Sequence, residues 1–321
     1  MKKIIVLLTF LSFCLVFLPP PSLSTSSIQV SPLVREYTLF PGERMKDLLI
    51  FANPSSSSQR VQIKVYDFLP TDELGGLRFF QDPGRQFSAS RWILFTPRDF
   101  VLGPAEEKTL PISVLVPEDA EPGTYFTAVF GEAKPEGKQH SSGQIQVRVN
   151  VGAGTLFLIN VPDVSGKKES YSGHLVSFEV WGLGKIGKNL KRIGGMPLGF
   201  VNKVLTFVVR FKNTGNFYQK PEGKIEVFDL LGRKVATLRI KKQRVLPGAI
   251  IQFRTPWQPF FLLGPYSAHL QFNYGRDNNL LIREEIRFCA FSPSVIFVFG
   301  VVVFLSAFFL LRRLFVSIVT H

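Results

Sequence analysis

Residues 60–68 read RVQIKVYDF, where Val61, Ile63 and Val65 alternate with polar or charged neighbours. A period of two places these three side chains on one face of an extended chain, which is typical of a half-buried strand. The same alternation returns at Leu110, Ile112, Val114 and Val116, and at Ile145, Val147, Val149 and Val151. Pro-Gly, Asn-Pro and Gly-Gly pairs separate these stretches as turns. Short alternating strands with such turns predict an antiparallel sandwich.

The second half of the chain repeats the same parts in the same order. A strand over residues 205–212 runs into an Asn-rich turn, as residues 48–52 do before Asn53. VLPG at 245–248 precedes a strand as VLGP at 101–104 does, and Gly-Pro-Tyr at 264–266 matches Pro-Gly-Thr-Tyr at 122–125. We therefore expect an all-β chain of two tandem immunoglobulin-like β-sandwich domains, over residues 28–162 and 163–287, followed by one transmembrane α-helix.

Two segments break the strand pattern. Residues 70–90 are polar and glycine-rich around a pair of phenylalanines, and they predict a long loop or a loose hairpin. Residues 182–199 are rich in glycine and basic side chains, with apolar residues only singly. Loops of this length are usually functional or disordered. The second segment could therefore lie on a bilayer surface, touch a wall polymer, or serve only as a connector.

Both ends of the chain carry membrane signals. Residues 288–311 contain no charge and precede Arg312 and Arg313. A bilayer core about 30 Å thick needs roughly 20 apolar helical residues, and paired arginines favour the cytoplasmic side. We expect a transmembrane helix over 288–311 and a short cytoplasmic tail over 312–321. Residues 1–27 resemble a secretory signal cleaved near Ser24 to Ser27; an uncleaved anchor is the alternative. The expected location is the cell membrane, single-pass, with the sandwiches outside.

Charge is distributed unequally between the two halves. Residues 28–162 carry 13 Lys and Arg against 15 Asp and Glu, a net charge of −2. Residues 163–287 carry 21 against 9, a net charge of +12. A basic domain beside a bilayer attracts anionic headgroups and, equally, anionic wall polymers. The alternative is that these cations only keep a β-rich domain in solution. An exported position excludes nucleic acid as a partner.

The sequence offers no catalytic or cofactor motif. It has four histidines and none of the metalloprotease, nucleophile-elbow, thiol-redox, P-loop or dinucleotide fingerprints. Cys14 lies in the signal and Cys289 at the expected membrane edge, so the exported part has no cysteine pair to oxidise. We expect a bacterial envelope protein that is not an enzyme and binds no metal or cofactor.

The candidate binding residues are cations and one tryptophan. The basic loop contributes Lys185, Lys188, Lys191 and Arg192, which could hold an anionic polymer. Trp257 lies in RTPWQPFF, between two prolines and beside Phe260 and Phe261. This residue is either part of an exposed aromatic patch, which would mark an interface, or a packed corner.

The opening of the chain resembles the pilus-chaperone-like sandwich. The resemblance rests on VSP at 30–32, PGE at 41–43, WILFTP at 92–97, VLGP at 101–104 and PGTY at 122–125. Pilus chaperones hold a subunit's C-terminal carboxylate with a cationic pair. Arg35 lies near the matching place, and the sequence identifies no lysine partner for it.

Over its whole length the chain resembles the bacterial WxL-interacting surface proteins. These have a signal, a sandwich described as peptidoglycan-binding, a second sandwich described as host-binding, and one C-terminal membrane helix. The resemblance implies envelope attachment and binding rather than catalysis. The basic loop at residues 185–192 departs from that family's pattern.

Two hypotheses follow from the sequence. The first is a membrane-anchored envelope protein whose sandwiches bind a wall polymer or another surface protein. The second is an exported, chaperone-like assembly factor that completes a partner's sheet by strand addition, which an exposed sheet edge permits. They differ in salt response, because binding through lysines weakens with ionic strength and main-chain pairing with apolar pockets does not.

Replacing Lys185, Lys188, Lys191 and Arg192 together by glutamine tests the first hypothesis. We expect weaker binding to an anionic wall polysaccharide, since each cation near an anionic surface contributes about 1 kcal/mol. Co-sedimentation with purified polysaccharide at low and high salt measures the affinity. Unchanged affinity would remove this loop from the binding surface.

Overall fold

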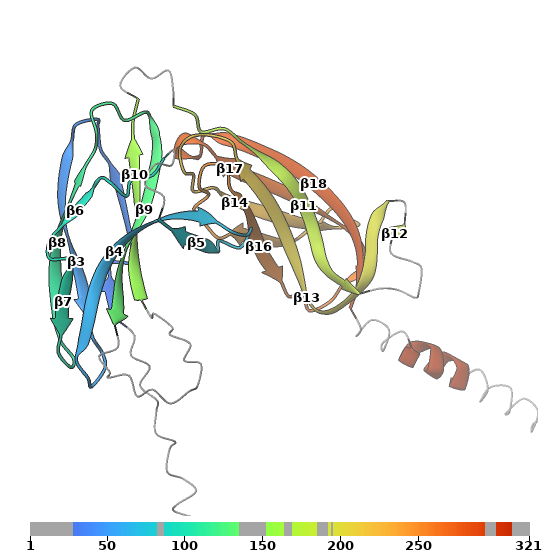
Figure 1. Cartoon of the computed structure of the whole chain (residues 1–321). Helices are drawn as coiled ribbons and strands as arrows, with labels where there is room; N and C mark the ends of the chain where they lie inside the picture. Colours follow the sequence, from blue (N-terminus) through green and yellow to red (C-terminus); the bar gives the residue numbers. More distant parts are fainter. Residues whose placement is uncertain are drawn as a thin grey trace, which may run out of the picture.

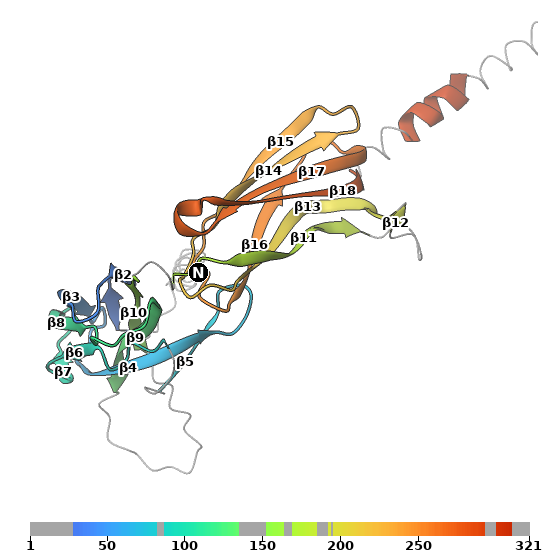
Figure 2. The same ribbon diagram turned by 90° about the horizontal axis from the view of Figure 1, so that it is seen from above.

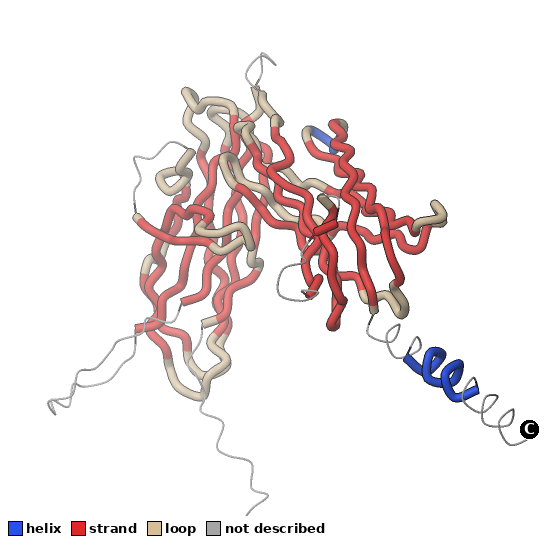
Figure 3. Tube along the Cα trace, turned by 90° about the vertical axis from the view of Figure 1, so that its right-hand side faces the viewer, coloured by secondary structure: helices blue, strands red, loops and turns tan. Residues whose placement is uncertain are grey.

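The computed structural model describes residues 28–81, 87–134, 152–163, 169–184, 192–193, 195–292 and 300–309. Most of these residues lie in strands, which form two bodies that meet along one side (Figure 1). The tube view shows strands throughout both bodies and a helix only near the C-terminus and in one short turn (Figure 3). The all-β, sandwich-like character expected from the sequence is confirmed.

The first body is a sandwich of two sheets. One sheet has the order β1-β3-β8-β6, formed by β1 (Gln29–Ser31), β3 (Arg44–Ala52), β8 (Glu107–Leu115) and β6 (Ile93–Phe95). The other has the order β2-β10-β9-β4-β5, with β7 beside β4. Its members are β2 (Val34–Thr38), β10 (Gly152–Val161), β9 (Gly123–Lys134), β4 (Gln59–Pro70), β5 (Leu77–Phe80) and β7 (Asp99–Leu102).

The alternating side chains of β4 and β8 face each other across this sandwich. Val61 and Ile63 of β4 are at most 4% exposed, and Leu110, Ile112 and Val114 of β8 at most 3%. Each fully buried side chain of this size contributes roughly 1.5–3 kcal/mol to folding. The two strands predicted over these residues are confirmed. The third alternating run, Ile145 to Val151, lies outside the described residues.

The first strand of the sandwich changes sheets part of the way along. β1 pairs with β3 in one sheet, and β2 pairs in parallel with β10 in the other. The crossing occurs at the Ser31–Pro32 peptide bond, which is cis. β2 therefore covers the outer edge of β10 along only part of its length, from Leu156 to Asn160.

The second body is one continuous sheet folded over into two layers. Its order is β11-β13-β18-β17-β14-β15, with β12 and β16 also beside β13. The strands are β11 (Gly173–Gly184), β12 (Arg192–Ile193), β13 (Met196–Asn213), β14 (Glu222–Asp229), β15 (Lys234–Ile240), β16 (Ile250–Trp257), β17 (Leu263–Tyr274) and β18 (Leu280–Phe291). A 3-10 turn, η1 (Arg276–Asn278), joins β17 to β18.

The long strand β13 makes the fold-over possible. Near its start it pairs with the end of β18, and along its second half it pairs with β16 in the other layer. The layers pack through phenylalanines: the rings of Phe211 and Phe253 each lie 5.3 Å from Phe272, and Phe207 lies 5.8 Å from Phe288. Figure 2 shows the two layers from above.

The segment over residues 70–90 begins as a hairpin, which was one of the two predicted forms. β5 pairs with the end of β4, from Asp67 to Pro70. The hairpin extends beyond the first sandwich and reaches the second body (Figure 2).

The expected membrane helix cannot begin at residue 288. Phe288 and Ala290 are fully buried in the second body, because residues 288–291 are the last residues of β18 and pair with the start of β17. The uncharged run at 288–311 therefore begins with the last residues of a core strand, β18, and only its later residues follow that strand. The described helix covers residues 300–309. Within the described residues, no helix has the length and apolar character needed to cross a membrane.

Phe272→Ala tests the packing between the two layers. Phe272 is fully buried against Phe211 and Phe253, so its truncation should cost about 3–5 kcal/mol of unfolding free energy. Val235→Ala, at a position 46% exposed in the same body, is the control and should cost less than about 0.5 kcal/mol. Urea unfolding measures both, and equal effects would contradict the layer contact.

Candidate functional site

Glu36 of β2 lies at the junction of the two bodies and accepts three hydrogen bonds from the second body. Tyr218 Oη donates to its carboxylate at 2.8 Å, Lys220 Nζ donates at 2.5 Å, and Arg244 Nε also donates. Burial raises the pKa of Glu36, but the bonds from Lys220, Arg244 and Tyr218 outweigh it and hold the pKa below its usual range. Burial and the bond to Glu36 raise the pKa of Tyr218 to about 12. Glu36 is therefore ionised and links the two bodies; we call such a polar contact between the bodies a tie.

The tip of the β4–β5 hairpin makes a second tie. The Glu73 carboxylate faces the Arg210 guanidinium of β13, with Arg210 Nε donating to Oε2 at 2.7 Å and Nη2 donating to the other oxygen. This contact lowers the pKa of Glu73. The Gln252 backbone N–H of β16 donates to the Glu73 carbonyl at 2.7 Å. The hairpin tip therefore contacts two paired strands, β13 and β16, at the register position where Arg210 lies opposite Gln252.

A third tie joins a turn of each body through the backbone. The Thr124 N–H donates to the Asn216 carbonyl at 2.8 Å, and the Tyr218 N–H donates to Thr124 Oγ1 at 2.8 Å. Asn216 Nδ2 donates to the Pro122 carbonyl, also at 2.8 Å. These bonds fix the corner at residues 122–125 against the Asn-rich turn that the sequence singled out.

Apolar side chains fill the space between these ties. Phe68, Phe126 and Leu158 of the first body belong to the same buried cluster as the core of the second. A cavity of about 160 Å³ remains at the junction, with apolar walls apart from Arg244. Polar contacts around this shared apolar core join the two bodies.

Among the described strands, none pairs with the outer edge of β10 at its first residues. β9 pairs with β10 along its entire length, whereas β2 begins to pair at Leu156, whose N–H donates to the Leu33 carbonyl at 2.9 Å. Backbone groups two residues apart point to the same edge of a strand. Gly152 and Gly154 therefore point their N–H and C=O groups to the same edge, and no described strand pairs with them there.

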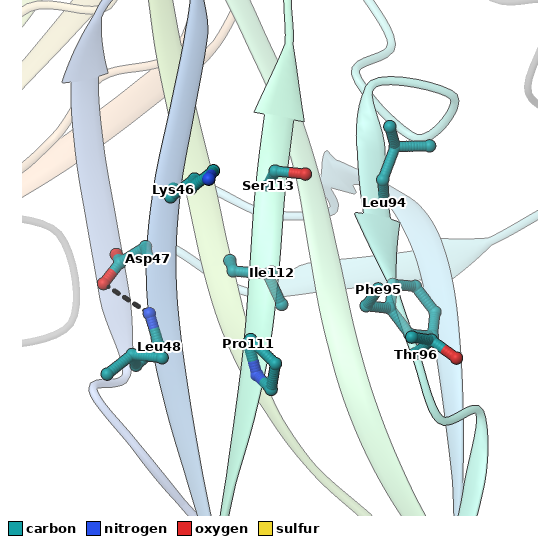
Figure 4. A pocket seen from close by; sticks show the side chains of 9 residues that line it. All are labelled: Lys46, Asp47, Leu48, Leu94, Phe95, Thr96, Pro111, Ile112 and Ser113. Atoms are coloured by element: carbon teal, nitrogen blue, oxygen red, sulfur yellow. Dashed lines mark hydrogen bonds between the residues drawn. The ribbon is translucent and has the colours of Figure 1, made fainter.

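A groove of about 610 Å³ lies on the outer face of the β3-β8-β6 sheet (Figure 4). Its apolar members include Leu48, 53% exposed, and Leu94, 44% exposed. Its nine lining residues are Lys46, Asp47, Leu48, Leu94, Phe95, Thr96, Pro111, Ile112 and Ser113. The groove is broad and shallow and brings together no set of groups suited to chemistry.

Arg35 lies beside β10, at the register position of Phe157. Its guanidinium is paired with Asp47: Nε lies 2.7 Å from one carboxylate oxygen and Nη2 donates to the other at 3.0 Å. Tyr37 donates to the same carboxylate. The charge that the chaperone resemblance implies for a partner's carboxylate is thus neutralised within the first body.

The residues singled out from the sequence do not come together as one site. Lys185, Lys188 and Lys191 lie outside the described residues, and the Arg192 backbone pairs with Pro197 at the start of β13. Trp257 ends β16 and is 8% exposed, 6.0 Å from Phe207 and 6.3 Å from Tyr266 between ring centres. It is the packed corner of the two alternatives. Its neighbour Phe260 is fully exposed.

Sequence reasoning missed the junction. Glu36 and Arg244 are separated by 208 positions, and Glu73 and Arg210 by 137. In the sequence, each of these four charged residues resembles an ordinary solvent-exposed residue of a strand or turn. No local pattern marks pairs of this kind.

No protein-family model matches the sequence, and no curated protein matches it. Solved structures with a similar fold include the class 5 fimbriae chaperone CfaA, 13% identical with a TM-score of 0.40, over 81% of this chain and 99% of that one. The Escherichia coli chaperone DraB is 14% identical with a TM-score of 0.35, over 83% and 96% of the two chains. The CsuC–CsuE chaperone–tip subunit complex of Acinetobacter baumannii is 11% identical with a TM-score of 0.34, over 71% and 90%. The likeness concerns the fold alone.

The lowered pKa of Glu36 predicts a pH-dependent junction. Its carboxylate stabilises the folded chain above the ordinary carboxyl pKa of about 4.3, and this contribution is lost as the pH falls through the lower pKa of the folded state. Glu36→Gln should therefore cost about 1 kcal/mol at neutral pH, since the group stays partly solvated. Urea unfolding of both proteins across pH measures the difference, which should vanish in acid.

Glu118→Gln is the matched control, because Glu118 is an exposed carboxylate of the same body. It should change stability little at any pH. A difference between Glu36→Gln and the parent that stays constant down to the most acid pH would contradict an ionised tie.

Proposed function

We propose that this chain is an exported assembly factor that binds another envelope protein by adding a β-strand to its sheet. The observation that carries the proposal is the open edge of β10, together with the alternating apolar sequence that leads into it. Ile145, Val147, Val149 and Val151 precede Gly152 directly and occupy every second position.

The alternation of buried side chains along β10 supports this proposal. Phe157, Ile159 and Val161 of β10 are fully buried in the first sandwich. Residues 145, 147, 149 and 151 share their odd parity, so a strand that extended β10 backwards would present them on the same face. Opposite β10, Gly152 pairs with Glu132, and the described part of β9 extends two residues further, to Lys134. Such an extension would run past the described part of its neighbour, where a partner's groove could receive the apolar side chains.

Strand addition suits such a segment physically. Main-chain hydrogen bonds to a partner's edge strand supply affinity, and pockets for alternate side chains supply specificity. Burial of each Val or Ile contributes roughly 1.5 kcal/mol or more before the cost of ordering the segment. The contacts at the junction would hold the second body against the first, so the bound partner would meet a defined surface.

We further propose that the factor is held at the membrane. Residues 1–27 would direct export. After β18, residues 292–311 are uncharged and precede Arg312 and Arg313, which is a length sufficient to cross a bilayer with the arginines on the cytoplasmic side. Both bodies would then lie outside. The proposed activity needs no catalysis, metal or cofactor, and its partner is a protein rather than nucleic acid.

Binding of an anionic wall polymer is the second candidate. It rests on the net charge of +12 over residues 163–287. Three of these cations face carboxylates of the first body: Lys220 and Arg244 pair with Glu36, and Arg210 pairs with Glu73. These contacts offset part of the positive excess at the junction, which favours the first candidate.

Placing a charge at the odd positions tests strand addition. Val147→Asp combined with Val149→Asp should abolish capture of an envelope partner, because a charge cannot enter an apolar pocket without a cost of several kcal/mol. Gln146→Asp combined with Asn150→Asp adds the same charge at even positions and should retain capture. The chain, immobilised in detergent, is exposed to the cell's exported proteins at low and high salt, and retained proteins are quantified.

Loss of capture in both variants, or in high salt alone, would contradict the proposal. The first result would mean that charge, not side-chain parity, governs binding. Loss of capture in high salt alone would favour binding through cations, as expected for an anionic polymer.

A further inference from the structure

One end of the second body displays four large apolar side chains. Phe260 is 100% exposed, Phe261 51%, and Leu230 and Leu231 73% each. Isolated exposed apolar residues are ordinary on a protein surface, but several gathered on neighbouring loops mark a contact surface.

The pairing of the strands places both loops at the same end. Leu230 and Leu231 form the turn after β14, whose last residue Asp229 pairs with Tyr266 of β17. Phe260 and Phe261 lie in the loop before β17, whose first residue Leu263 pairs with Phe291 of β18. Both loops therefore flank the C-terminal end of β18. In Figure 2 the β14–β15 turn and the end of β18 lie on the side of the helix at 300–309.

The phenylalanine loop is bonded to the point where the chain leaves the body. The Ser292 N–H donates to the Leu262 carbonyl at 3.0 Å, and the Leu262 N–H donates to Ser292 Oγ at 3.4 Å. Leu262 is buried, and Trp257 packs at the base of the loop. Phe260 thus lies two residues before Leu262, which is hydrogen-bonded to Ser292, the first residue after β18.

We infer that this end of the second body is a lipid-contacting surface, in which Phe260, Phe261, Leu230 and Leu231 enter the interfacial region of a bilayer. The inference rests on the proposed membrane anchor, because the exit at Ser292 brings these loops to the bilayer only if residues 292–311 cross it. Exposed apolar side chains gain free energy by leaving water for the boundary between headgroups and acyl chains. Arg233, beside Leu231, is paired with Asp229 at 2.7 Å, so the turn brings no unpaired charge of these two residues to the interface.

The opposite end of the same body has a different chemistry. There β17 and β18 are joined by Arg276, Asp277 and Asn278, and the first body is attached. Twelve residues of β18 separate the two ends, a distance of about 36 Å at the usual rise of a strand. The bilayer contact would therefore set the second body upright on the membrane and hold the first body away from it.

Tryptophan at position 260 measures this contact in the full chain. Phe260→Trp and a control, Leu280→Trp at the other end of β18, are each reconstituted into vesicles of phosphatidylcholine and phosphatidylglycerol. Part of the phosphatidylcholine carries bromine near the headgroup end of its acyl chains and quenches nearby indoles. Subtracting the signal of the parent chain removes Trp92, Trp181 and Trp257. We expect about twofold quenching at position 260 and almost none at position 280.

An alkaline wash of the same vesicles separates the two proposals. A chain retained by the wash, with position 260 quenched and position 280 not, supports the lipid-contacting surface. A retained chain with position 260 unquenched overturns the surface and leaves the anchor intact. Equal quenching at both positions also overturns it, because the body would then have no preferred end. Release of the chain by the wash overturns the anchor and, with it, the surface.

Discussion

The carboxylate of Glu36 is the interaction on which the two-armed structure depends. A tyrosine hydroxyl, a lysine and an arginine from the second body converge on one side chain of β2. Because β2 is also the strand that covers part of β10, the same few residues set the angle between the bodies and the extent of the open edge. Removal of Glu36 would leave two like charges and a hydroxyl without their acceptor. Removal of the three donors would leave a carboxylate unpaired at a partly buried position.

The rest of the junction reinforces this arrangement from the other side. The β4–β5 hairpin crosses from the first body to the second, and its acidic tip binds the paired strands β13 and β16 through Arg210 and Gln252. An apolar core shared by Phe68, Phe126 and Leu158 lies between the two sets of polar ties. The proposed binding edge and the proposed lipid-contacting end lie on different bodies, so their separation is fixed by this junction.

The strands with strict alternation could be predicted from the sequence, because a period of two depends only on which neighbours are buried. β4 and β8 are examples, and their inward residues are those expected. The fold-over of β13 could not be predicted, since pairing with both β16 and β18 depends on contacts far along the chain. The expected start of the membrane helix at residue 288 was wrong for a related reason: Phe288 to Phe291 carry no charge because they end a core strand. The sequence left open whether Trp257 is packed or exposed. Its burial depends on Phe207 and Tyr266, which lie on other strands and pack around it.

The direction of β18 has a mechanical consequence. The first body is attached at one end of the second body, and the chain leaves at the other end after Phe291. A force that pulled the two apart would act along β18 and load all twelve of its residue pairs with β17 at the same time. Antiparallel hydrogen bonds lie perpendicular to the strands, so this pull shears the ladder instead of opening it pair by pair. The second body is therefore built to transmit tension between whatever holds the first body and whatever holds the C-terminus.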